Sequence, residues 1–183
     1  MTGFSVVTTA RTVGALQWAL IRLSELFDEW VALSDDPQEW VWLSTTSRHL
    51  RGHVQPVAHI LPDSELLADI AIVVAASPEL ADALDSMGAT SSSVDGDNPY
   101  LMVRARALIL QLVDDCDAVL GYCASHSDGP LARVVAALGV DLATDITSAD
   151  LVMGGLPRET DGDRAIPVVG FVPDPNLTDR LKP

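Results

Sequence analysis

The sequence predicts an α/β protein with a Rossmann-like, mostly parallel sheet and helices on both faces. Apolar runs rich in β-branched residues alternate along the chain with segments whose apolar residues recur every three or four positions. Such alternation is typical of a parallel sheet covered by helices. With 183 residues, 48% of them apolar and 20% charged, the chain can form one core. We expect a single domain over residues 1–172 and an irregular tail over residues 173–183.

An all-helical bundle is the alternative fold, and in it residues 64–87 form one long helix. Two observations favour the α/β prediction instead. Pro78 would interrupt that helix. The run over residues 70–74 is rich in β-branched side chains, which are typical of strands.

The first elements are a strand, a helix and a second strand. Residues 4–9 predict a short buried strand, and apolar spacing over residues 13–30 predicts an amphipathic helix of about five turns. Turn-forming residues 34–37 end this helix. The aromatic and β-branched run 40–43 predicts the second strand. Further on, Pro56 argues against an uninterrupted helix.

A third strand and a well-marked helix follow in the middle of the chain. Residues 70–75 are strongly apolar and predict a strand. Ser77 has the character of an N-cap residue, with a proline and an acid next, so a helix should run from there to about residue 87. Gly88 is expected to end that helix. We expect residues 89–98 to form either a surface tether or a mobile lid.

The last elements continue the alternation. The patterns predict helices over residues 100–113 and 131–138, and strands over residues 118–122 and 140–142. Gly139 is expected to separate the second helix from the last strand. The whole series therefore fits a parallel sheet with crossover helices.

The charge balance excludes one class of partner. The formal net charge is −15, and Lys182 is the single lysine, so a groove for long nucleic acid, which needs many cations, is not expected. No apolar run reaches the roughly 20 residues that a membrane helix needs. The cysteines, Cys116 and Cys123, fit no paired framework. We therefore expect a cytoplasmic protein without membrane association.

A near-repeat marks the candidate ligand site. Residues 6–11 and 43–48 each end with two threonines, a small residue and an arginine. Both lie at the carboxyl end of a predicted strand, where an open α/β sheet binds its ligand. Hydroxyls, backbone N–H groups and guanidinium groups together suit an anion or a phosphate. The candidate ligand-binding residues of the repeat are Thr8, Thr9, Arg11, Thr45, Thr46 and Arg48.

A polar loop over residues 124–130 supplies the second group of candidates. Its imidazole and carboxylate groups have the chemistry of general acids and bases, although helix capping explains the aspartate of the loop equally well. The candidate ligand-binding residues here are Ser125, Ser127 and Gly129. The candidate catalytic residues are Asp117, His126 and Asp128.

Three histidines in the first half of the chain are candidate metal ligands. His49 and His53 would share one face of a helix, and His59 is near in sequence. No metal-binding motif accompanies them, and the neighbouring Arg48 and Arg51 would repel a cation. We therefore predict no metal site, and the sequence identifies no cofactor.

Five short motifs follow one another in the second half of the chain, at residues 98–100, 104–107, 117–120, 127–131 and 136–139. With these motifs, residues 98–140, about a quarter of the chain, resemble the C-terminal half of SLOG-type and nucleoside 2-deoxyribosyltransferase-like Rossmann domains. The resemblance implies a Rossmann-like fold that binds nucleotides or nucleosides at the strand ends. Pro130 stands where those families have threonine, and no glutamate follows in the next helical turn. The resemblance therefore implies a fold and a ligand edge rather than glycosyl transfer through a covalent glutamate intermediate.

Together these observations predict a protein that binds a nucleotide, a nucleoside or another phosphorylated small molecule at the C-terminal edge of the sheet. If the protein is an enzyme, hydrolysis of a glycosidic or phosphoester bond is the expected reaction. The alternative is a non-enzymatic protein-interaction or regulatory module built on the same core. Both interpretations leave a homo-oligomer open.

Overall fold

The structure is a helical bundle. The computed structural model describes residues 5–61, 72–91, 101–123, 128–154 and 170–173. No β-strand occurs in these ranges, so the prediction of an α/β, Rossmann-like fold is wrong and the all-helical alternative is the correct class. The described helices are α1 (Val6–Val31), α2 (Pro37–Ala58), α4 (Pro78–Ser91), α5 (Leu101–Tyr122) and α6 (Gly129–Val152).

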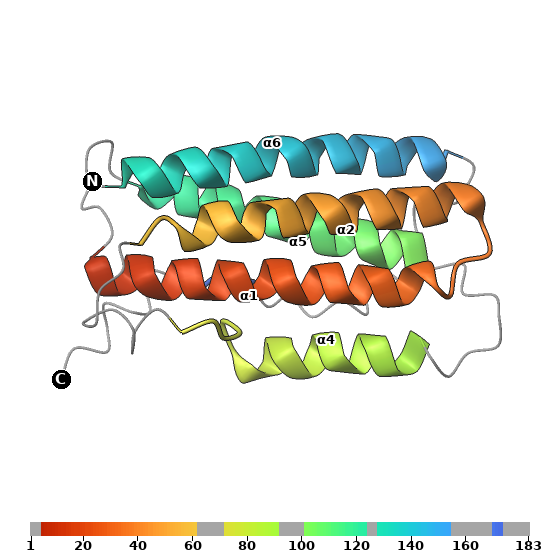
Figure 1. The fold of residues 1–183 in the computed structure, drawn as a ribbon, viewed down its shortest axis with the longest axis horizontal. Coiled ribbons are helices and arrows are strands. Elements are labelled where there is room, and N and C mark those ends of the chain that lie inside the picture. Colours follow the sequence, from red (N-terminus) through yellow and green to blue (C-terminus); the bar gives the residue numbers. More distant parts are fainter. Residues whose placement is uncertain (1–4, 62–71, 92–100, 124–127, 155–169, 174–183) are drawn as a thin grey trace.

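Successive described helices run in alternating directions along the long axis of the molecule (Figure 1). α1 packs along α2, α2 packs against α6, and α6 packs against α5. α4 lies against α1 on the side away from α6 (Figure 1). Leucines from all five helices, together with Phe27, Trp30 and Trp42, form a continuous core.

α1 begins where a strand was predicted. The side-chain oxygen of Ser5 accepts a hydrogen bond from the backbone N–H of Thr8 at 3.1 Å, which caps the helix at its first turn. The periodic apolar residues that follow are buried to Trp30, as their spacing predicts. The strand predicted over residues 4–9 is therefore wrong, because the cap and the continuing apolar stripe outweigh the weak β-preference of two valines and two threonines.

α2 replaces the second predicted strand. Asp36 caps the helix by accepting a hydrogen bond from Gln38 N at 2.7 Å, and Pro37 occupies the first turn. Residues 40–43 are consequently helical, with Trp42 buried and Trp40 exposed. The helix also runs through Pro56, which is exposed near its C-terminal end. The expected interruption at that proline is absent.

α4 starts at the predicted place. Ser77 Oγ accepts a hydrogen bond from Leu80 N at 3.2 Å, which confirms the N-cap. The helix continues past the predicted stop at Gly88. Gly88 therefore lies within the helix and faces α1, where a Cβ atom would lie 2.8 Å from the end of the Glu29 side chain, Oε2.

The later strand predictions are also wrong. α5 continues through residues 118–122 and α6 through residues 140–142. Gly139 lies inside α6 and nothing stands within 4 Å of an added Cβ there. The buried positions of both helices recur at helical spacing over their whole length. This longer period identifies the helices, whereas each run of four or five apolar residues taken alone fits either element.

The described segment near the C-terminus joins the core through α5. Phe171 is buried, and its backbone N–H donates to the buried carboxylate of Asp115 at 2.5 Å. Gln111 donates to the other carboxylate oxygen at 3.3 Å. Burial raises the pKa of Asp115, and the hydrogen bond from Phe171 opposes that rise.

Two further predictions concern segments that lie only partly within the described residues. Residues 72–77 are not helical, so the single long helix over 64–87 does not form. Of the predicted tether or lid, residues 89–91 belong to α4 and the rest lies outside the described residues. None of the described helices is long and apolar enough to cross a membrane.

Candidate functional site

The first half of the near-repeat forms the start of α1. Thr8 is buried and its hydroxyl lies 2.8 Å from that of Ser5, so it belongs to the helix cap. Thr9 is half-buried and Arg11 is exposed in the next turn. These residues are near a helix N-terminus, but the strand end expected beside them does not exist.

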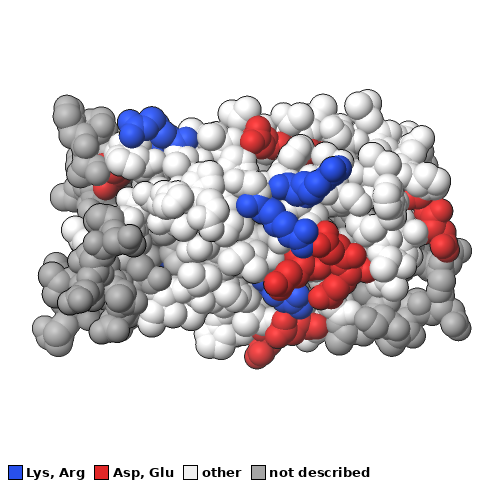
Figure 2. All heavy atoms as spheres, viewed as in Figure 1, with Lys and Arg blue, Asp and Glu red and all other residues white. Residues whose placement is uncertain are grey.

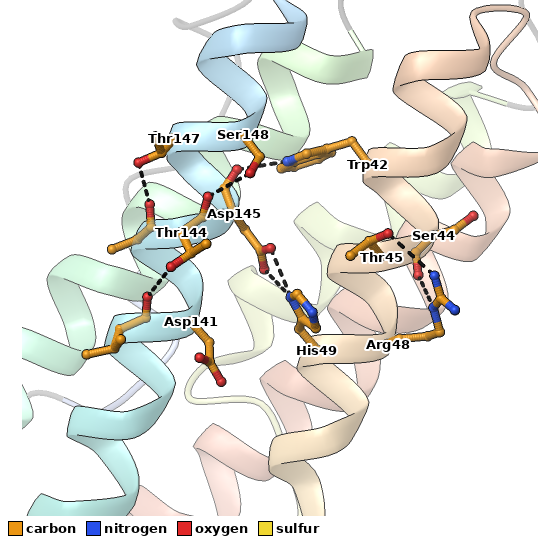
Figure 3. A network of polar contacts seen from close by, with 12 residues as sticks. Trp42, Ser44, Thr45, Arg48, His49, Asp141, Thr144, Asp145, Thr147 and Ser148 are labelled. Carbon is orange, nitrogen blue, oxygen red and sulfur yellow. Dashed lines mark hydrogen bonds and ion pairs between the residues drawn. The ribbon is translucent and has the colours of Figure 1, made fainter.

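The second half of the near-repeat lies in the middle of α2. Arg48 is exposed and folds back along its own helix, where it donates to Ser44 O at 3.2 Å and to Thr45 Oγ1 at 3.4 Å (Figure 3). The hydroxyl of Thr46 is fully buried and has no hydrogen-bond partner among the described residues. Thr46 therefore does not face a ligand at the surface.

The two arginines of the repeat do not meet. Ser47, next to Arg48, donates to the carbonyl of Ser24 on α1 at 3.0 Å. Arg11 precedes Ser24 by thirteen residues on the same helix, which is about 20 Å along the axis. A shared anion cradle at one edge is therefore not formed.

The second group of candidates lies around the start of α6. Asp128 is the buried N-cap residue, and its backbone carbonyl accepts a hydrogen bond from Ala132 N at 2.8 Å. Gly129 is the first residue of the helix. Asp117 is exposed on α5. Ser125, His126 and Ser127 lie outside the described residues, so no geometry tests their roles.

The polar network that the structure does assemble joins α2 to α6 (Figure 3). His49 Nδ1 lies 2.9 and 3.1 Å from the two carboxylate oxygens of Asp145. One turn away on each helix, His53 Nε2 lies 2.8 Å from Asp141 Oδ2. Trp42 Nε1 donates to the backbone carbonyl of Asp145 at 2.8 Å. These three contacts fix the antiparallel register of the two helices.

In this network the Asp145 carboxylate holds the imidazole of His49 in one orientation. Asp145 is buried, and desolvation raises the pKa of its carboxyl group while the hydrogen bond with His49 opposes the rise. An imidazole held through Nδ1 leaves Nε2 for exchange with solvent. No group of three or more metal-ligating side chains occurs among the described residues.

From the sequence, His49 and His53 are candidates for metal ligands only, and Asp141 and Asp145 are not among the predicted site residues. A signal was available in the sequence, since both pairs are four residues apart and would share a helix face. The matching spacing of two histidines and two aspartates is consistent with two facing helices.

An apolar patch lies where α2 begins and α6 ends, at ends that are adjacent in Figure 1. Val41 and Leu151 are 55% and 79% exposed there, and we call them the end patch. Trp40 is 51% exposed but lies about 200° around α2 from Trp42, which faces α6, so it is not part of this patch. The register set by His49 and Asp145 places Val41 opposite about residue 153, so Leu151 is displaced by roughly 3 Å along the axis. Val41 and Leu151 are therefore neighbours on the outer surface.

Charged groups are distributed unevenly around this patch. In Figure 2, acidic and basic atoms lie side by side in the middle of the face, and the upper right of the face is almost uncharged. Ion pairs between the described helices include Arg22 with Asp85, at 3.0 Å, and Arg51 with Asp28. The turn before α2 carries carboxylates without a basic residue in the same stretch of sequence. These carboxylates belong to Asp35, Asp36 and Glu39.

The comparisons with known proteins add no assignment. No family model, curated protein or solved structure matches the chain.

Proposed function

We propose that the chain is a non-enzymatic protein-interaction module that binds its partner through the end patch. The observation that carries this proposal is the exposure of two large apolar side chains, Val41 and Leu151, at adjacent helix ends. Exposed apolar side chains that lie near one another are typical of binding sites.

The polar groups of α2 and α6 support the same interpretation. The imidazoles of His49 and His53 already have carboxylate partners on α6, so they hold the helices in register. The guanidinium of Arg48 is occupied by its own helix. We place the interaction in the cytoplasm, since Cys116 and Cys123 are both unbridged thiols, as expected in a reducing compartment.

Site-specific photo-cross-linking in cells tests the proposal. A benzophenone side chain replaces Val41 in one variant and Val140 in the control, because Val140 is also exposed, at 67%, but lies about 16 Å along α6 from Leu151. We expect a discrete adduct of constant mass from position 41 that disappears in Leu151→Ser. Absence of an adduct, or the same adducts from both positions, would contradict the proposal.

A thermal-shift panel of nucleotides and sugar phosphates tests small-molecule binding in parallel. A ligand at 100 times its dissociation constant should stabilise the protein by about 2.7 kcal/mol. A shift that disappears in Arg11→Ala or Arg48→Ala would favour a small-molecule site over the interaction module. The module predicts no shift that depends on those arginines.

A further inference from the structure

His49 is the more exposed of the two histidines in the α2–α6 network, at 43% against 14% for His53. We infer that Nε2 of His49 accepts a phosphoryl group from an N-phosphoryl donor. This class of donor includes phosphoramidate and a phosphorylated histidine of another protein. The inference goes beyond the proposed function, because it assigns a modification site in the interior of α2 and does not depend on the end patch.

The orientation of the imidazole is the first part of the argument. His49 Nδ1 lies 2.9 and 3.1 Å from the two oxygens of the Asp145 carboxylate, which can only accept a hydrogen bond. The proton of the neutral imidazole is therefore on Nδ1, and the lone pair is on Nε2. Asp145 is 5% exposed and belongs to the facing helix, so it holds the ring in place. Nε2 is consequently a nucleophile that need not lose a proton before it reacts.

The surface beside His49 leaves room for a donor to approach. Helix geometry places Trp42 and His53, which contact α6, on one side of His49. Thr45 and Gly52 lie on the other side. Gly52 is exposed, and nothing stands within 4 Å of a Cβ atom added there. The outer side of the imidazole is therefore bordered by a position without a side chain.

A cation lies on the same outer side. The guanidinium of Arg48 donates to Ser44 O at 3.2 Å and to Thr45 Oγ1 at 3.4 Å (Figure 3). Because Thr45 is about one turn before His49, this guanidinium lies within one helical turn of the imidazole. Both contacts are exposed and long for hydrogen bonds, so the guanidinium can exchange them for the oxygens of a phosphoryl group. The surroundings of Nε2 therefore favour an anionic electrophile.

The second pair of the network lacks these features. His53 contacts Asp141 Oδ2 through Nε2, at 2.8 Å, so the nitrogen that is open in His49 is occupied in His53. The same contact engages Asp141, which is one turn before Asp145 on α6. The structure thus supplies an internal comparison, in which one histidine of the network should react and the other should not.

The transfer can be written with its atoms and electrons balanced. The lone pair of His49 Nε2 attacks the phosphorus of phosphoramidate, an Nε2–P bond forms, and the N–P bond of the donor breaks. Ammonia leaves with the electron pair of that bond, since the donor nitrogen already carries three hydrogens. The phosphorylated ring keeps its proton on Nδ1, and the carboxylate of Asp145 balances the positive charge of the ring. A protonated phosphohistidine of another protein would react in the same way, with neutral imidazole as the leaving group.

Treatment of the full-length chain with phosphoramidate tests the inference. Phosphorus NMR distinguishes the Nε2 and Nδ1 isomers of phosphohistidine, and loss of a signal in His49→Gln assigns it. We expect His49 to react at Nε2 about tenfold faster than His59, an exposed histidine outside the network, while His53 stays unmodified. Equal rates at His49 and His59, or reaction of His49 mainly at Nδ1, would overturn the inference.

Two matched alanine variants test whether Asp145 is a positioning residue. Asp145→Ala leaves Nδ1 of His49 without its carboxylate, so the product should divide between the Nδ1 and Nε2 isomers. Asp141→Ala removes the same group from the other pair and should leave the Nε2 preference of His49 unchanged. Circular dichroism checks that the helices of both variants are intact. The same ratio of isomers in both variants would overturn the inference.

A second matched pair tests the cation. Arg48→Ala should slow phosphorylation of His49 about threefold, because the charge beside the phosphoryl oxygens is lost. Arg51→Ala removes the same charge from the same helix, but Arg51 lies about 200° around α2 from His49 and pairs with Asp28 of α1. Its rate should change less than about twofold. Equal slowing in both variants would show an effect of net charge and overturn the inference.

The chain isolated from its own cells under alkaline conditions distinguishes the two sources of the donor. We expect phosphohistidine at position 49 there. With a partner protein as donor, its level falls in Val41→Ser/Leu151→Ser while the rate with phosphoramidate is unchanged, and with a small donor both are unchanged. Absence of phosphohistidine at position 49 would overturn the inference. The interaction module would survive that result, since it fails only if the end patch gives no specific cross-link.

Discussion

Two histidine–aspartate pairs join α2 to α6, and the partner that is buried differs between them. In the first pair the carboxylate is inside, since Asp145 is 5% exposed and His49 is 43% exposed. In the second pair the imidazole is inside, since His53 is 14% exposed and Asp141 is 54% exposed. The contact distances are nearly equal, at 2.9 and 2.8 Å.

The difference shows that distance alone does not determine how much a polar contact contributes to stability. An exposed carboxylate such as Asp141 keeps much of its hydration when its partner is removed, so its pair contributes little to stability. A buried carboxylate such as Asp145 has lost most of its water, so removal of its partner leaves a desolvated group without compensation. We therefore expect removal of one partner to lower the free energy of unfolding more in the first pair than in the second.

Removal of the first imidazole should have the largest effect. His49→Ala leaves Asp145 buried without its side-chain partner, which should lower the free energy of unfolding by about 2 kcal/mol. Urea unfolding followed by circular dichroism measures the change. The double variant His49→Ala/Asp145→Ala should recover part of the loss, because the uncompensated carboxylate is gone. A double variant that is less stable than His49→Ala would contradict this account.

Trp42 tests the backbone contact at the same end of the interface. Trp42→Phe removes the 2.8 Å hydrogen bond to the Asp145 carbonyl but keeps an aromatic ring near Phe27, whose centroid is 6.0 Å from that of Trp42. We expect a loss of about 1 kcal/mol. Unfolding in urea gives the value, and Trp18→Phe is the control for loss of an indole that is only partly buried. Equal losses of stability in the two variants would mean that indole packing, rather than the hydrogen bond, accounts for the effect of Trp42→Phe.

The helix starts show what could be predicted from the sequence. Ser77 and Pro78 identify the beginning of α4 because a cap acts through neighbouring residues only. The strands over residues 4–9 and 40–43 were mispredicted for the opposite reason. Their short apolar runs fit either element, and the result depends on contacts with helices distant in sequence.

The candidate site was less accessible to prediction than the helices. The near-repeat predicts a site at Arg11 and Arg48, but that prediction requires a sheet edge that the described residues do not form. The contact between His49 and Asp145 joins positions 96 residues apart. Spacing can show that two histidines share a face, but only the packing of α2 on α6 shows which carboxylates they meet.

The pH dependence of stability should distinguish the buried carboxylate. Burial raises the pKa of Asp145, so the folded state holds its proton more tightly than the unfolded chain does. Its contribution to stability is full below the unfolded pKa, about 4, and is lost as the pH rises through the folded-state pKa. The Asp145→Asn variant has no carboxyl group at position 145 to titrate. The stability of the wild type relative to that variant should therefore fall as the pH rises above 4, and a constant or rising difference in urea unfolding would contradict this.

Neutralisation of the exposed carboxylate should have the smallest effect. Asp141→Asn keeps the size of the side chain and can still accept a hydrogen bond from His53 Nε2, so we expect a loss of about 0.5 kcal/mol or less at neutral pH. The urea midpoint of this variant is compared with that of His49→Ala under identical conditions. A loss as large as that of His49→Ala would mean that burial does not separate the two pairs. The α2–α6 interface would then depend on both pairs equally, and the asymmetry between its two ends would have no energetic meaning.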